Sequence, residues 1–167
     1  HRIARRQRQM CIRDRYIMAL TKTPVCDFGK KAEDFKLKSI ENKIISLNDV
    51  KGEKATLIMF ICNHCPYVKA IIRDLAKDCN ELKKDGINSI AIMSNDTKNY
   101  PEDSFDNMIK FAKTNNFGEI NYLIDETQEI ARKYGAVCTP DFFGYNKELK
   151  LQYLSLIHIS EPTRRAI

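Results

Sequence analysis

A continuous apolar run over residues 55–61 is followed almost at once by a helical pattern, and this junction constrains the fold more than any other feature. The run has the length of a strand and carries no charge, as expected of a strand that is buried on both faces. From His64 to about Lys84, apolar residues recur every three or four positions, which predicts an amphipathic helix that ends near Gly86. A buried strand that leads directly into such a helix predicts an α/β domain.

Strand patterns recur along the rest of the chain. They cover residues 35–37, 43–46, 89–93, 121–124, 142–143 and 149–153. The first two segments predict an N-terminal hairpin and the last two a closing hairpin, because short polar connections separate the members of each pair. Strands that alternate with helices support the α/β assignment.

Two more helices are expected between these strands. Pro101 is suited to the first turn of a helix, and it would place Asp103 in that turn, where an acidic side chain is favourable. Asp125 and Gln128 resemble a capping box that opens a second helix, which would end at Gly135.

The formal net charge of +6 resides in the two ends of the chain, because residues 16–153 hold equal numbers of basic and acidic side chains. Both ends resemble translated sequencing-adapter read-through. We therefore interpret residues 1–15 as a non-native basic arm, residues 154–167 as a non-native tail and residues 16–153 as one truncated domain. The alternative, a genuine arm that binds nucleic acid, lacks interleaved aromatic residues and glycines, so no nucleic-acid partner is expected.

Composition and cysteine spacing narrow the class of protein. The hydrophobic share of 43% and the charged share of 30% are typical of globular chains. No apolar stretch is long enough to span a bilayer, so we expect no membrane partner. The cysteines within residues 16–153 are irregularly spaced and do not form a disulfide framework, which predicts a reducing, cytoplasmic setting.

Two of these cysteines lie at the strand–helix junction, in Cys62-Asn63-His64-Cys65-Pro66. The N-terminus of a helix offers unpaired N–H groups and a positive dipole, both of which favour a thiolate. Cys62 and Cys65 are close enough in sequence to form a disulfide, and His64 could lower the pKa of Cys62 below the ordinary value of about 8.5. A CxxC pair at such a junction in an intracellular chain is typical of thioredoxin-like redox sites.

The remaining cysteines carry weaker signals. A lone CxxC can be half of a zinc or iron–sulfur site, but Cys26, Cys79 and Cys138 form no second CxxC, so we expect neither a metal nor another cofactor. Cys79 lies on the apolar stripe of its helix and is expected to be a core thiol. Cys138 is a candidate auxiliary thiol. It precedes Thr139-Pro140, in which Pro140 is either an ordinary turn residue or a cis proline.

Five motifs together resemble a redoxin family of the thioredoxin superfamily, whose members are described as thioredoxin-family or alkyl-hydroperoxide-reductase/thiol-specific-antioxidant domain proteins. They lie at residues 60–70, 94–96, 100–104, 125–128 and 134–143. The resemblance implies a thioredoxin-like fold, with a central mixed sheet flanked by helices and preceded by an N-terminal hairpin. It makes Cys62 the nucleophile and Cys65 the resolving thiol, and it makes Pro140 a cis proline that faces the disulfide.

The chain also departs from related families. It has no Trp and no acidic residue between Lys54 and Cys62, where thioredoxins carry a buried carboxylate that serves as a proton acceptor. Residues 57–61 lack the Pro and Thr with which peroxiredoxins hold a peroxide. The C-terminal helix that completes a thioredoxin fold is expected to be missing, which would leave one sheet face uncovered and the chain prone to aggregation.

The function predicted on these grounds is a thiol–disulfide oxidoreductase with Cys62, His64, Cys65 and Pro140 at its site. Its partners would be disulfide-containing proteins or small thiols and a dithiol reductant. The alternatives are a peroxiredoxin-type thiol peroxidase and a non-catalytic module that binds metal or senses redox state.

Overall fold

The structure is a computed structural model that describes residues 27–156, and in this range seven strands form one mixed sheet in the order β2-β1-β5-β4-β3-β6-β7. The strands are β1 (Lys36–Ser39), β2 (Ile44–Ser46), β3 (Ala55–Phe60), β4 (Ile87–Met93), β5 (Asn121–Ile124), β6 (Asp141–Asn146) and β7 (Leu151–Leu156). The central strands β3, β4 and β5 are parallel, whereas the outer pairings are antiparallel. The thioredoxin-like fold and both expected hairpins are confirmed.

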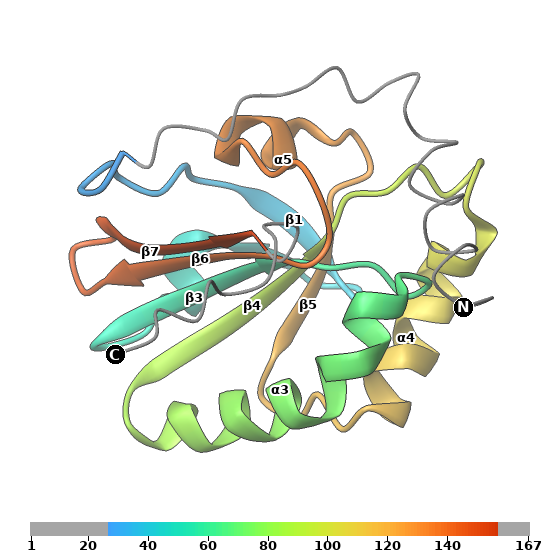
Figure 1. Ribbon diagram of the computed structural model, residues 1–167, viewed down its shortest axis with the longest axis horizontal. Helices are drawn as coiled ribbons and strands as arrows, with labels where there is room; N and C mark the ends of the chain where they lie inside the picture. Colours follow the sequence, from blue (N-terminus) through green and yellow to red (C-terminus); the bar gives the residue numbers. More distant parts are fainter. Residues whose placement is uncertain (1–26, 157–167) are drawn as a thin grey trace, which may run out of the picture.

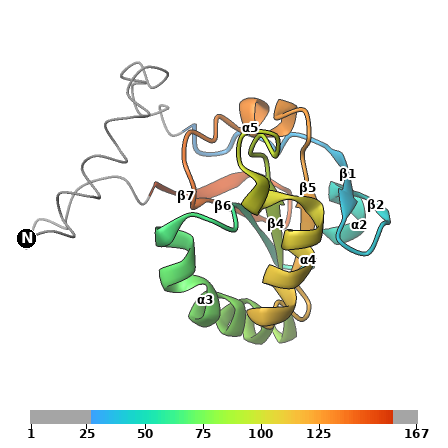
Figure 2. The same cartoon turned by 90° about the vertical axis from the view of Figure 1, so that its right-hand side faces the viewer.

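Helices cover both faces of this sheet. They are α2 (Leu47–Val50), α3 (Pro66–Lys84), the short 3-10 helix η2 (Pro101–Asp103), α4 (Phe105–Thr114) and α5 (Glu129–Tyr134). Figures 1 and 2 both show α3 and α4 on one side of the sheet and α5 on the other. None of the helices within residues 27–156 has the length and apolar character that crossing a bilayer requires.

Successive side chains of a central strand point to opposite faces of the sheet and pack in two different hydrophobic cores. Met59 packs with the buried stripe of α3, whereas Ile58 and Phe60 pack on the α5 side. Because both faces are covered, the strand between them is apolar throughout, which is why residues 55–61 show no alternation in sequence.

Two expected helix starts differ from the structure. The segment that begins at Pro101 is interrupted at Ser104, which is extended and forms the N-cap of α4, so Asp103 lies outside that helix. The predicted capping box is also wrong. Gln128 occupies the N-cap of α5 with a left-handed backbone, and the carboxylate of Asp125 accepts the N–H of Ala131 instead.

Several expectations lie outside the described residues. They concern the basic arm, Cys26, most of the tail and the C-terminal helix expected to be missing. Strand β7 continues through residues 154–156, where it pairs with the start of β6.

Candidate active site

The two cysteines of the CxxC pair lie where three segments meet. Cys62 follows the end of β3, and Cys65 is the N-cap of α3, with Pro66 as the first helical residue. Strand β6 is antiparallel to β3, with Asp141 opposite Phe60, so the residues just before β6 lie beside the CxxC pair. The chain after β4, which is parallel to β3, approaches the same edge.

Both thiols are free, nearly enclosed and in contact with Thr139. Cys62 is 1% exposed and Cys65 is 8% exposed. The Cys62 sulfur lies 3.2 Å from the Thr139 hydroxyl, and the Cys65 thiol donates to the Thr139 carbonyl oxygen at 3.2 Å. The peptide bond between Thr139 and Pro140 is cis. The residues predicted around the CxxC pair therefore share one small site.

The two thiols ionise as a pair. Contact with Cys62 lowers the pKa of Cys65 to about 5, and the N–H groups of Val68 and Tyr67 act in the same direction. Contact with Cys65 and burial raise the pKa of Cys62, and the charge of Asp103 adds to this rise. The pair as a whole loses its first proton well below the pKa of a free thiol. The expected lowering of the pKa of Cys62 itself is wrong, because the contact with Cys65 and burial both favour its protonated form.

Asp103 is a functional candidate that the sequence did not identify. It is 0% exposed, and its carboxylate makes four hydrogen bonds. Oδ1 accepts the backbone N–H groups of Asn63 at 2.7 Å and His64 at 3.3 Å. Oδ2 lies 2.7 Å from His64 Nδ1 and accepts the Asn95 amide at 2.8 Å. One carboxylate thus ties the CxxC loop to the segment after β4. The sequence did contain one signal. Ser104 is a residue type that commonly caps the N-terminus of a helix, which indicates that the turn containing Asp103 ends before α4 begins.

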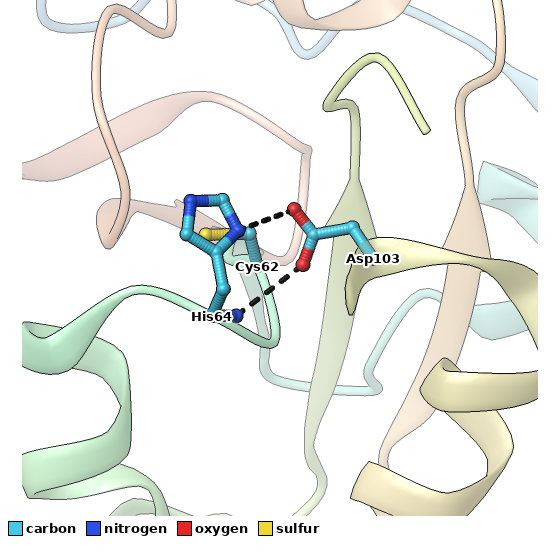
Figure 3. A group of neighbouring side chains, drawn as sticks. All are labelled: Cys62, His64 and Asp103. Atoms are coloured by element: carbon cyan, nitrogen blue, oxygen red, sulfur yellow. Dashed lines mark hydrogen bonds and ion pairs between the residues drawn. The ribbon is translucent and has the colours of Figure 1, made fainter. Parts of the chain in front are cut away.

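His64 lies close to both this carboxylate and the Cys62 sulfur. Figure 3 shows its ring directed toward Asp103 and in front of the sulfur. His64 also contacts Tyr100, whose ring stacks on the imidazole at a centroid distance of 5.0 Å and an interplanar angle of 4°. His64 is therefore held in place by a carboxylate and an aromatic ring.

A second set of buried polar contacts holds the CxxC loop. The Tyr122 hydroxyl donates to the side-chain oxygen of Asn63 at 2.9 Å, and the Asn63 amide donates to the backbone oxygen of Glu102 at 3.1 Å. Asn63 and Tyr122 are both buried. The middle of the CxxC motif is thus fixed by hydrogen bonds from both ends of the Asn63 side chain.

The other two cysteines of the described chain differ in setting. Cys79 is buried in the α3 core, as expected, and burial raises its pKa. Cys138 is half-buried, and burial together with the charge of Asp141 raises its pKa to about 11. Cys138 is therefore protonated at neutral pH, which makes it a poor nucleophile in the ground state.

Asp141 is a second buried carboxyl group that the sequence did not identify. It is 0% exposed and accepts the Val137 N–H at 3.3 Å through Oδ2, while Oδ1 has no hydrogen-bond partner among residues 27–156. Burial raises the pKa of Asp141 to about 7.

Replacing Asp141 with Asn should flatten the pH dependence of stability. A carboxyl group whose pKa is raised on folding stabilises the native state below its unfolded pKa, near 4, and loses this contribution as the pH rises to about 7. The slope is at most about 1.4 kcal/mol per pH unit. Urea denaturation of both proteins between pH 4 and pH 8 measures it. Parallel stability curves would show that Asp141 is already ionised.

Comparison with known proteins identifies the family of this domain. The sequence profile of the AhpC/TSA family matches residues 28–154. The chain belongs to the AhpC/TSA family. This redoxin domain is also similar to a conserved protein of Geobacillus kaustophilus, with 41% identity over 86% of this chain and 76% of that one, at a TM-score of 0.77. No curated protein matches the sequence significantly.

Two further solved structures resemble the AhpC/TSA domain. A protein of Sinorhizobium meliloti is 34% identical over 86% of this chain and 78% of that one, with a TM-score of 0.77. The thioredoxin domain of a thiol-disulfide oxidoreductase from Bacteroides vulgatus is 18% identical over 79% of this chain and 90% of that one, with a TM-score of 0.66. At this low identity the last match supports the fold alone.

Proposed function

We propose that this AhpC/TSA domain is a thiol–disulfide oxidoreductase that uses Cys62 and Cys65 as a dithiol/disulfide couple. The observation that carries the proposal is the contact between the two thiols, which lowers the pKa of Cys65 to about 5 and lets the pair exist as one thiolate and one thiol. A thiolate beside a second thiol is the arrangement that thiol–disulfide exchange requires.

The reaction follows from this arrangement. The Cys62 thiolate attacks one sulfur of a substrate disulfide, which forms a mixed disulfide and releases the other substrate sulfur as a thiol. The Cys65 thiolate then attacks the Cys62 sulfur, and the second substrate thiol leaves. Two electrons and two protons pass to the substrate, and the Cys62–Cys65 disulfide is reduced again by a dithiol reductant.

Cys62 is assigned as the nucleophile because its sulfur faces groups that can donate to a thiolate. These are the Thr139 hydroxyl and the Cys65 backbone N–H. In the resting pair Cys65 is the more acidic thiol, so the attack begins when the shared proton passes from Cys62 to Cys65, from which the Thr139 carbonyl oxygen can accept a hydrogen bond. Since Cys62 is 1% exposed, the attack also requires side chains around its sulfur to move.

The resolving step needs a Cys65 thiolate. The N–H groups of Val68 and Tyr67 favour this anion independently of Cys62. The start of α3 thus stabilises the Cys65 anion without acting as a proton acceptor.

The substrates proposed are protein or small-molecule disulfides in a reducing, cytoplasmic compartment. Peroxide reduction is less well supported, because residues 57–61 provide no Pro or Thr to hold a peroxide next to Cys62.

Reduction of insulin disulfides by dithiothreitol tests the proposed function. The purified protein should accelerate it, and the Cys138→Ser variant should do so equally well. The same preparations should consume hydrogen peroxide no faster than free dithiothreitol does. Peroxide consumption without insulin reduction would make the protein a thiol peroxidase instead.

A further inference from the structure

Three side chains of different chemistry converge at one point of the active site. The Cys62 sulfur, a nitrogen of the His64 imidazole and an oxygen of the Asp103 carboxylate all lie within 4.8 Å of one another (Figure 3). The sulfur follows β3, the imidazole lies in the turn before α3, and the carboxylate comes from η2. Sulfur, nitrogen and oxygen ligands together are the set that Zn²⁺ accepts in proteins.

The distances fit a zinc ion after small movements. Bonds of about 2.0–2.3 Å in tetrahedral geometry put ligand atoms roughly 3.4–3.7 Å apart. The contact between His64 Nδ1 and Asp103 Oδ2, now 2.7 Å, would widen as a metal takes the place of the hydrogen-bonded proton. The Cys62 sulfur lies no more than 4.8 Å from the other two ligand atoms, so it would move inward by at most about 1 Å, which a side-chain rotation provides.

The surroundings hold these ligands in position. Asp103 Oδ1 is fixed by the backbone N–H of Asn63, and Oδ2 also accepts the Asn95 amide. The His64 ring is restrained by stacking on Tyr100. Hydrogen bonds to the ligands of a metal orient them before it arrives, and their loss typically lowers affinity by about 10- to 100-fold.

The local charge also favours a cation. Asp103 is fully buried, and its carboxylate lies within 4.8 Å of the Cys62 sulfur. Two anionic groups held close together in a buried site repel each other, and a divalent ion between them removes that repulsion.

We propose that the reduced protein binds one Zn²⁺ through Cys62, His64 and Asp103, with a fourth position open to water. Binding releases the thiol proton of Cys62 to solvent, and the imidazole proton moves to the nitrogen that does not bind zinc. Zinc and the Cys62–Cys65 disulfide are then mutually exclusive, because both use the Cys62 sulfur. Zinc binding itself does not depend on the proposed function, whereas inhibition of disulfide exchange by zinc rests on it.

Titration of the fully reduced protein with zinc, in competition with a chromogenic chelator, tests this site. We expect one zinc per chain. Asp103→Asn and His64→Gln should each weaken binding at least about tenfold. Cys65→Ser should not weaken binding, because Cys65 is not one of the three ligands. Loss of binding in Cys65→Ser, with no effect of Asp103→Asn or His64→Gln, would overturn the proposal in favour of a site made by the CxxC pair.

Cobalt provides a readout on the unaltered protein, which avoids variants that fail to fold. Co²⁺ bound to reduced wild-type protein should show the absorption of a single thiolate ligand, whereas two thiolates would contradict the ligand set. Insulin reduction is measured separately, with metal removed by a chelator. Activity without zinc binding defeats only the metal site, and zinc binding without activity defeats only the proposed oxidoreductase.

Discussion

Replacing Cys65 with Ser should stop turnover and leave the substrate covalently attached to Cys62. The first attack still takes place, but no second thiol is available to release the mixed disulfide. Incubation of this variant with oxidised glutathione should give a mass increase of one glutathione per chain, and its insulin reductase activity should fall to the background rate. Intact-protein mass spectrometry and peptide mapping identify the attachment site.

The matched variant separates the roles of the two sulfurs. Cys62→Ser should show neither turnover nor a trapped adduct, whereas Cys138→Ser should behave like the wild type. Because the pKa of Cys65 is the lower of the two, the competing outcome is an adduct on Cys65 in the Cys62→Ser variant. That result would reverse the assignment of nucleophile and resolving thiol.

Replacing Asp103 with Ala should lower the free energy of unfolding by at least about 1–3 kcal/mol, the cost of leaving one buried hydrogen-bond donor without its acceptor. The change leaves the backbone N–H of Asn63 and the side chain of Asn95 without their acceptor. Groups buried without a partner account for most of this cost. Urea denaturation monitored by circular dichroism measures it.

The neighbouring Glu102 provides the control for this change. Its side chain is exposed, so Glu102→Ala should alter stability by no more than about 0.5 kcal/mol. A loss of less than about 1 kcal/mol in Asp103→Ala would mean that water replaces the carboxylate without difficulty. The tie between the CxxC loop and η2 would then be incidental to folding.

The parts of this protein that sequence predicts are those determined by nearby residues. The apolar run of β3 and the stripe of α3 are patterns within about 30 residues, and both elements are confirmed, with the CxxC pair at the junction between them. Asp103 escaped prediction because its partner Asn63 is 40 residues away and no local pattern connects them. Asp141 escaped it because a single Asp at the start of a strand gives no sign of being 0% exposed.

The acidity of the two thiols could not be predicted from the position of the helix start alone. The expected helix begins at His64, whereas the observed helix begins at Pro66. The acidity of the pair depends chiefly on the contact between the two sulfurs, which lowers the pKa of Cys65 and raises the pKa of Cys62. The CxxC spacing predicts that the two sulfurs lie near each other, but it does not indicate which of them holds the shared proton.

The contact between Cys62 and Thr139 joins residues 77 positions apart, and this separation has a consequence for biosynthesis. During translation the CxxC pair leaves the ribosome long before strand β6, which must pair with β3 to bring Thr139 into place. Contacts between residues so distant in sequence form late in folding, because closing a long loop is entropically costly. A nascent chain therefore exposes Cys62 and Cys65 as unprotected thiols until the β6–β7 hairpin pairs with β3, and in that interval they are open to oxidants and to foreign disulfides.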